Sequence, residues 1–297
     1  MAGQKIKSSR TDRVFEAVNV TLLVIISVLI IYPLYYVLIA SFTDPDQLTG
    51  QLLLYPEKFF VGGYRKIFNY PPLWTGYWNT IRYTVTSVLV SLLCTIPCGY
   101  ALSRKDFAGR RQVMFLFTFT MFFNGGLIPL FLVVNGMKLY NTIWAVVLPS
   151  AVSVYNLIIC RSFFESTIPS ELLEAAILDG SSDFQFFFKI AVPLSTTIIS
   201  VMALFYGVSM WNTYLYPLMF LADMEMMPLS IILRNLVLLD SVNNIAASDA
   251  EGIAYASKLA AQMKFGIIVV AAAPLLIVYP FLQKYFVQGV MIGAIKG

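Results

Sequence analysis

The sequence has no histidine and little charge. None of its 297 residues is His, and charged residues make up only 12% of the chain, against 59% that are hydrophobic. Without imidazole, Ser-His-Asp and Cys-His nucleophile systems and histidine metal ligands are excluded. A soluble domain usually carries about 25% charged residues, so too few are present here to cover a water-facing surface. The composition therefore argues against a soluble globular protein.

Cysteine and phosphate-binding motifs are also scarce. The three cysteines, Cys94, Cys98 and Cys160, lie in apolar stretches, where a thiol packs as a small hydrophobic group. No Gly-Lys dipeptide occurs, so the chain lacks a P-loop and is not expected to hydrolyse nucleotides itself. We therefore predict a protein that is not an enzyme and that holds no metal or other cofactor of its own.

Six long stretches contain no Asp, Glu, Lys or Arg. About 20 apolar residues, each rising about 1.5 Å, cross the hydrocarbon core of a bilayer. The uncharged interval 67–81 contains Pro71-Pro72 and is too short and too broken to be a further span. We predict an all-α membrane protein with a transmembrane domain at 17–287, tails at 1–16 and 288–297, and six spanning helices at about 18–40, 83–102, 113–134, 143–160, 196–222 and 265–283.

The absence of charge inside these stretches also bears on mechanism. Ion-coupled carriers generally place ionisable residues inside the membrane to bind protons or cations. A membrane-embedded enzyme would need carboxylates, His or reactive Cys at that depth. A self-contained secondary carrier or a membrane enzyme is therefore the less favoured alternative to a protein that is energised by a partner.

The basic residues predict the orientation of the chain. With six spans both termini share one side of the membrane, and that side carries 12 Lys and Arg residues against 8 on the other. Four of them lie in the tail 1–16 and four in the loop 104–111. Because Lys and Arg are enriched in cytoplasmic segments, we expect a multi-pass protein with both termini in the cytoplasm.

The interval 161–195, between the fourth and fifth spans, contains five acids and two bases. Ser170 is placed to cap a helix after Pro169, with an apolar face of Leu172, Leu173, Ala176 and Ile177. Gly180 is placed to end this helix, and Asp183 to begin another. We predict a helix, a glycine turn and a second helix on the cytoplasmic face. An apolar surface tipped with acids, outside the lipid, indicates a protein partner.

This interval resembles the EAA loop of importer permeases in ATP-binding cassette transporters. Glu174-Ala175-Ala176 is followed by Gly180, then by Ile190 and Pro193 at the family's spacing, although Val192 replaces the usual Leu. By this resemblance, the ATPase-coupling residues are Glu174, Ala175, Ala176, Asp179, Gly180, Ile190 and Pro193.

Other motifs resemble the maltose-type second permease of carbohydrate importers. They are Trp211-Asn212 with Tyr214 and Pro217-Leu218, together with the ending from Gln283 to Gly297. Asn124-Gly125-Gly126 followed by Ile128-Pro129 is similar to the branch that handles complex oligosaccharides.

The resemblance implies a permease subunit of a binding-protein-dependent, ATP-driven oligosaccharide importer in the bacterial cytoplasmic (plasma) membrane. Such a subunit forms half of the translocation pathway and couples to its ATPase through the EAA loop. The implied partners are the lipid bilayer, a second homologous permease in a heterodimer, two ATPase subunits or an ATPase homodimer that bind ATP and Mg, and an extracytoplasmic solute-binding protein. No nucleic-acid partner is implied.

Residues of the substrate pathway are harder to predict. Trp211, Asn212 and Tyr214 combine stacking faces with hydrogen-bonding groups that suit sugar rings, but aromatic packing between helices explains them equally well. Asn124 lies where Gly125, Gly126 and Pro129 should bend a helix, either to line a pathway or to allow close packing. The outer loop 223–264 is a further candidate surface, with the polar residues Arg234, Asn235, Asn243 and Asn244.

Overall fold

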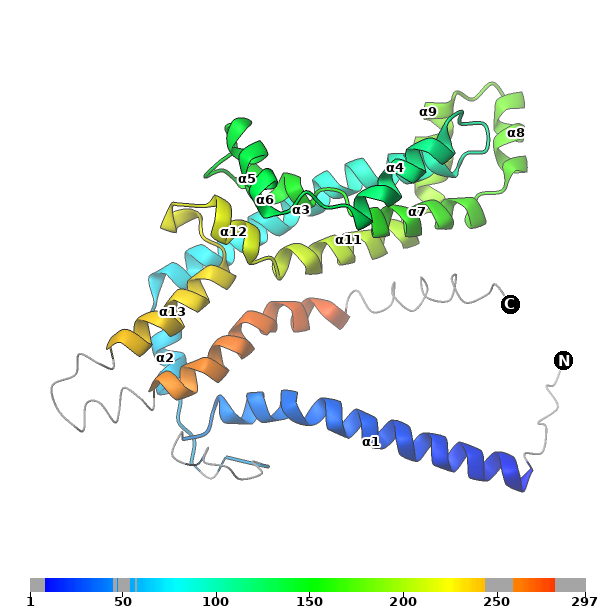
Figure 1. The fold of residues 1–297 in the computed structure, drawn as a ribbon. Helices are drawn as coiled ribbons and strands as arrows, with labels where there is room; N and C mark the ends of the chain where they lie inside the picture. The colour runs from blue at the N-terminus through cyan, green and yellow to red at the C-terminus, as the bar shows by residue number, and fades with distance from the viewer. Residues whose placement is uncertain (1–8, 45–46, 48–53, 57, 244–258, 281–297) are drawn as a thin grey trace. The chain divides into compact units, whose positions relative to one another are not determined.

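The computed structural model describes residues 9–44, 47, 54–56, 58–243 and 259–280 (Figure 1). These residues are mainly helical, and the strand-like pairing among them is an isolated antiparallel bridge between Thr43 and Phe59. The chain divides into two compact units, one from 1–69 with 236–271 and one from 70–235 with 272–297.

The first unit contains α1 (Arg10–Ala40), α2 (Gly62–Phe68) and the first half of a helix at Leu259–Pro280. Buried Gln262 holds these elements together, because its amide nitrogen donates to the carbonyl oxygens of Ser41, at 3.0 Å, and Phe60. Its side-chain oxygen accepts from the backbone N–H of Gly63 at 2.8 Å. The single amide therefore joins the end of α1 to the start of α2.

The second unit begins with α3 (Pro71–Ser103), α4 (Arg110–Phe122), α5 (Leu127–Gly136), α6 (Ile143–Val147) and the short turn η2 (Leu148–Ser150). It continues with α7 (Val154–Thr167), α8 (Ser170–Leu178), α9 (Asp183–Phe186), the π-helical η3 (Phe187–Ala191) and α10 (Val192–Leu194). The last elements are α11 (Thr196–Trp211), α12 (Leu215–Phe220), η4 (Met224–Met226) and α13 (Leu229–Asn243), which runs past the boundary of the unit.

Three helices, α1, α3 and Leu259–Pro280, are each long and apolar enough to cross a membrane. Three helix pairs pass the same test only together, and their bends are 117° at α4–α5, 52° at Ile143–Ser150 with α7, and 76° at Asp183–Leu194 with α11. Among the described residues, the number of candidate spans is therefore three, or up to six if each bent pair is one span. The prediction of six lies at the upper end of this range.

The helices extend beyond several of the predicted spans, whose bounds in the membrane stay predictions. The second helix begins at Pro71, not near 83, because prolines in a first turn remove only N–H groups that have no partner within the helix. Trp74 and Trp78 consequently lie within α3. The first helix begins at Arg10, after a capping box between Ser9 and Asp12. The fourth continues to Thr167, beyond the predicted end at 160.

The predicted break in the third span is confirmed. The helix stops at Phe122 and resumes at Leu127, with Gly126 at φ 86°, a left-handed value that glycine adopts readily. Asn124 stabilises the turn, since its side-chain oxygen accepts from the N–H of Gly126 at 2.8 Å. The fifth span is also interrupted: α11 ends at Trp211 and α12 begins at Leu215.

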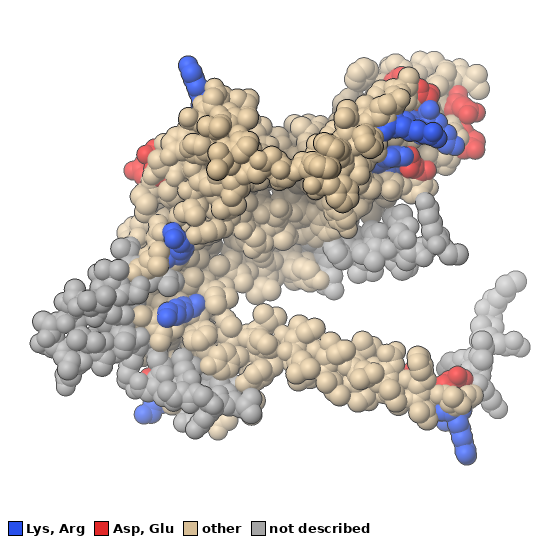
Figure 2. Space-filling model, viewed as in Figure 1, with Lys and Arg blue, Asp and Glu red and all other residues tan. Residues whose placement is uncertain are grey.

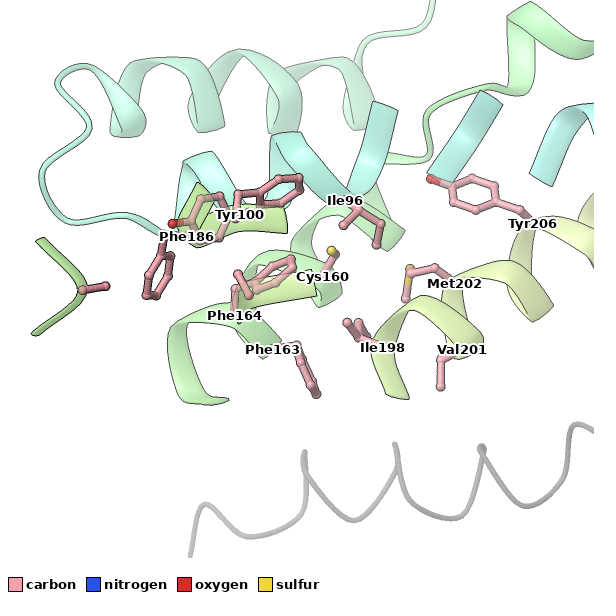
Figure 3. Packing of buried hydrophobic residues seen from close by; sticks show 13 residues of the cluster. Ile96, Tyr100, Cys160, Phe163, Phe164, Phe186, Ile198, Val201, Met202 and Tyr206 are labelled. Carbon is pink, nitrogen blue, oxygen red and sulfur yellow. The ribbon is translucent and has the colours of Figure 1, made fainter. Parts of the chain in front are cut away.

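The core of the second unit lies where α3 packs against α7 and α11 (Figures 1 and 3). Gly99 of α3 lies against Cys160 of α7, and a Cβ placed on this glycine would be 2.8 Å from the sulfur. Tyr206 of α11 shares a 2.7 Å hydrogen bond with Thr95 of α3 and accepts from the N–H of Ser153 at 3.2 Å. A glycine and a buried polar group therefore allow three helices to approach closely.

Candidate functional site

The helix α8 carries the EAA-like residues and ends in a Schellman motif. The N–H of Gly180 donates to the carbonyl of Ile177 at 3.0 Å, and the N–H of Ser181 donates to that of Ala176 at 2.9 Å. This pattern requires a left-handed residue after the cap, and Gly180 has φ 77°. The predicted role of Gly180 in ending the helix is confirmed. Ser170 was wrongly predicted as the N-cap, since it is the first helical residue and Pro169 occupies the cap.

Only part of α8 is buried. Ala176 contacts the core of the second unit, with Leu173 packed beside it, whereas Glu174 and Ala175 are exposed. Ile177 is 55% exposed and Leu178 is 89% exposed. The predicted apolar face is therefore divided: Leu173 and Ala176 attach the helix, whereas Leu172 and Ile177 are exposed. Ile177 and the neighbouring Leu178 form an outward apolar surface beside the Glu174 carboxylate.

The following elements, α9, η3 and α10, form the second arm of the turn. Ser182 begins α9 through a capping box. The Ser182 hydroxyl accepts from the backbone N–H of Gln185, and the side-chain oxygen of Gln185 accepts from the backbone N–H of Ser182. Phe186 and Phe187 are buried, while Phe184 is 78% exposed. Five residues then form a π-helix, a rare geometry that is frequent at functional sites.

The two remaining predicted coupling residues lie beyond this π-helical turn. Ile190 is half-buried against the core, and Pro193 is exposed within α10. The chain then turns by 76° into α11. Of the seven predicted coupling residues, Glu174, Ala175, Asp179, Gly180 and Pro193 are exposed, Ile190 is half-buried and Ala176 is buried. We call residues 169–195 the α8–α10 segment.

Tyr100, near the end of α3, anchors the α8–α10 segment. Its ring lies 5.0 Å from that of Phe187. It also lies 6.4 Å from the ring of Phe186 and 5.6 Å from that of Phe164 in α7 (Figure 3). Aromatic rings at these separations attract beyond their simple burial. Tyr100 could not be identified from the sequence, because its contacts join residues more than 60 positions apart and no local pattern marks them.

Arg104, one turn beyond Tyr100, adds an ionic contact to the same segment. Its guanidinium donates to both carboxylate oxygens of Asp106 and, through Nη1, to Asp183 at 3.1 Å and to the Tyr100 hydroxyl at 3.0 Å. The Asp106 hydrogen bonds are the main cause that raises the pKa of Arg104, and the same bonds lower the pKa of Asp106. Figure 2 shows acidic and basic side chains gathered at this end of the unit, around α8, α9 and the start of α4.

The predicted substrate-pathway residues lie at two helix breaks. Trp211, Asn212 and Tyr214 occupy the break between α11 and α12, and Asn124 the break between α4 and α5. Asn212 donates to the carbonyl of Val208 at 2.8 Å, and Tyr214 packs on a neighbouring hydrophobic cluster. Both asparagines thus make local backbone hydrogen bonds, which accords with the packing alternative as well as with a pathway role.

The start of the predicted outer loop is held by polar side chains of α3 that the sequence analysis missed. Asn79 donates to the carbonyls of Glu225 and Met227 at 2.7 and 3.1 Å, and the hydroxyl of Tyr83 donates to that of Met226 at 2.6 Å. Within α13, Arg234 is exposed and Asn235 half-buried. Asn243 is the last residue of α13, while Asn244 and the ending from Gln283 to Gly297 lie outside the described residues.

Asn141 also holds the start of this loop. It adopts φ 58°, and its side-chain oxygen accepts from the N–H groups of Ala222 and Asp223 at 2.9 and 3.2 Å. Its side-chain nitrogen donates to the Asp223 carboxylate at 2.7 Å. Asparagine tolerates a left-handed conformation better than most residues, so one residue supplies both the turn and its hydrogen bonds.

Comparisons with known proteins agree with this arrangement. Residues 73–292 match the family described as "Binding-protein-dependent transport system inner membrane component". The chain is 37% identical over 288 residues to the polygalacturonan/rhamnogalacturonan transport system permease protein YtcP of Bacillus subtilis (strain 168), covering 96% of this chain and 99% of the relative. It is 31% identical to the arabinooligosaccharides transport system permease protein AraQ of Halalkalibacterium halodurans, covering 92% and 93%.

A solved structure is similar as well. A chain in the crystal structure of a bacterial ABC transporter involved in the import of the acidic polysaccharide alginate superposes with a TM-score of 0.81 at 32% identity. The match covers 95% of this chain and 100% of the other. With the family match over most of its length and two permeases above 30% identity, this chain belongs to the inner membrane components of binding-protein-dependent transport systems.

Proposed function

We propose that the chain forms half of the translocation pathway of an ATP-driven oligosaccharide importer, in a heterodimer with a second permease. The family match and the relatives' names support this role. The remaining components are two ATPase subunits, which bind ATP and Mg, and an extracytoplasmic solute-binding protein. The alternative, a self-contained carrier, would need its own source of energy, and the predicted spans contain no Asp, Glu, Lys, Arg or His that could couple transport to protons or cations.

The proposed topology has six spans with both termini in the cytoplasm. Three straight helices and three bent pairs supply the six. The 16 residues of α11 rise about 24 Å, less than the ~30 Å hydrocarbon core, so the fifth span needs residues beyond α11 itself. The excess of Lys and Arg in the tail 1–16 and in the loop 104–111 supports the orientation.

The α8–α10 segment is the proposed ATPase-docking site. One observation carries this assignment: an exposed surface of Glu174, Ala175, Ile177 and Leu178 projects from a helix whose other face is anchored in the core. The small Ala175 side chain permits close approach, and the Glu174 carboxylate is available to a basic residue of the partner. When the ATPase dimer closes on ATP, movement of this segment is passed to the membrane helices.

Replacing Gly180 tests the docking site. Gly180→Val forces a β-branched residue into φ 77°, at a cost of about 1–2 kcal/mol, and should disrupt the end of α8. Gly180→Asn is the matched control, because asparagine tolerates this conformation. We expect the Val variant to insert into the membrane normally but to lose co-purification with the ATPase, while the Asn variant keeps most of it. Normal co-purification of both variants would contradict the docking assignment.

We further propose acidic oligosaccharides as the substrate class. The YtcP relative is named for polygalacturonan and rhamnogalacturonan, and the similar structure comes from a transporter of the acidic polysaccharide alginate. The AraQ relative is named for arabinooligosaccharides, which are neutral, so it represents the competing class. Calorimetric titration of the cognate binding protein with oligogalacturonides and arabinooligosaccharides tests this choice. Binding of the neutral sugars alone would refute it.

A further inference from the structure

We propose that Arg104 is a positioning residue that transmits movement of the α8–α10 segment to α3. This inference rests on the proposed docking role of that segment. Arg104 directly follows the last residue of α3, and its guanidinium reaches Asp183, the first residue of α9. Among the ion pairs of the described residues, the pair between Arg104 and Asp183 is the one that connects the end of α3 with α9.

Hydrogen bonds orient the guanidinium on its own side of this contact. Nε and Nη2 bind the two oxygens of Asp106, and Nη1 is shared between Asp183 and the hydroxyl of Tyr100. The Arg104 side chain is only 15% exposed, and its charged end lies 5.9 Å from the centroid of the Tyr100 ring. Asp106 and Tyr100 thus orient one N–H edge of Arg104 toward Asp183.

The contact complements an aromatic attachment beside it. Tyr100 touches Phe186 and Phe187, which follow Asp183 in the same arm of the turn. The aromatic contacts add buried packing between the two elements, and the charge-assisted hydrogen bond between Arg104 and Asp183 adds a directional link from α3 to the first turn of α9. A displacement of the α8–α10 segment is therefore transmitted directly to α3.

A lysine could not replace this geometry. Arginine presents donors in a planar fork that can bind two carboxylates at once, whereas lysine has a single flexible ammonium group. Arg104 also belongs to the basic loop 104–111, whose positive charge is expected to set membrane orientation. Arg104→Lys keeps that charge and loses the fork, so it separates transmission from a purely topological role.

Hydrogen–deuterium exchange on the complex of the two permeases and the ATPase tests the proposal without a sugar. The permease, its partner permease and the ATPase are placed in lipid nanodiscs and compared with and without ATP plus vanadate, which traps the ATPase. In the wild type we expect trapping to change exchange in both peptides 170–178 and 96–106. In Arg104→Lys, Arg104→Gln and Asp183→Asn, the change at 96–106 should fall roughly threefold to fivefold, the range expected for one partly exposed ion pair, while that at 170–178 persists.

A matched control and a double variant make the result decisive. Arg161→Gln removes an arginine that pairs with Glu165 inside α7, and it should behave as the wild type. Combining Arg104→Gln with Asp183→Asn should have no larger effect than either change alone. If Arg104→Lys or Asp183→Asn shows the same change in exchange at 96–106 as the wild type, the proposal is overturned. These two variants keep the test decisive even if Arg104→Gln does not assemble. Absence of any wild-type response at 170–178 would instead refute the docking site.

Discussion

The close approach of α3 and α7 predicts that Gly99→Ala will destabilise the protein. A Cβ at this position would lie 2.8 Å from the Cys160 sulfur, 3.2 Å from the Cys160 Cβ and 3.3 Å from the Arg161 backbone nitrogen. Carbon atoms normally pack about 3.5–4.0 Å apart, so the helices must separate. Overpacking of this kind costs about 1–3 kcal/mol.

The expected effect is measurable as a melting temperature. Domains of 150–250 residues shift their Tm by about 2–4 °C per kcal/mol, and on this scale a cost of about 1–3 kcal/mol gives a decrease of about 2–12 °C for Gly99→Ala in nanodiscs. Gly207→Ala, in α11, is the matched control because its nearest neighbour would be Val88 at an ordinary 3.6 Å. In a Cys160→Ala background the cost of Gly99→Ala should shrink, since the sulfur is gone. Equal Tm values for Gly99→Ala and the wild type would refute the packing described for α3 and α7.

Two further variants address buried and turn-forming polar groups. Tyr206→Phe removes the hydroxyl that hydrogen-bonds to Thr95 and Ser153 and leaves the buried Thr95 hydroxyl without this partner, so the free energy of unfolding should fall by about 1–3 kcal/mol. The loss should be smaller when Thr95→Val is present as well. Additive Tm losses would contradict a shared hydrogen bond. Asn141→Gly keeps the left-handed turn but loses the bonds to Asp223, whereas Asn141→Ala adds backbone strain, so Tm should decrease in the order wild type, Gly, Ala. An Ala variant that melts like the wild type would show that this turn contributes nothing.

The sequence predicted best what local chemistry decides. The break at Asn124-Gly125-Gly126 and the end of α8 at Gly180 follow from glycine's access to left-handed conformations, and both are present. Absence of charge located the apolar helices. The N-terminal part of α3 was missed because Pro71-Pro72 was interpreted as a break, although prolines are compatible with a first turn.

Contacts between distant residues could not be predicted from these patterns. Tyr100 and Arg104 follow an ordinary apolar stretch, and their partners Phe187 and Asp183 lie about 80 positions away. Asn79 likewise bonds to backbone carbonyls beyond position 220. The coupling residues came from the spacing of a known motif, whereas the residues that attach them to α3 depend on packing that only the fold defines.

Reconstitution is the most direct test of the central claim, that this chain transports only as part of an ATP-driven complex. Proteoliposomes would contain this chain alone, or the chain with its second permease, the ATPase and the binding protein, with ATP supplied or withheld. Uptake of labelled oligogalacturonide is expected only with all components and ATP. Uptake by this chain alone, driven by an ion gradient, would contradict the account and favour a self-contained carrier.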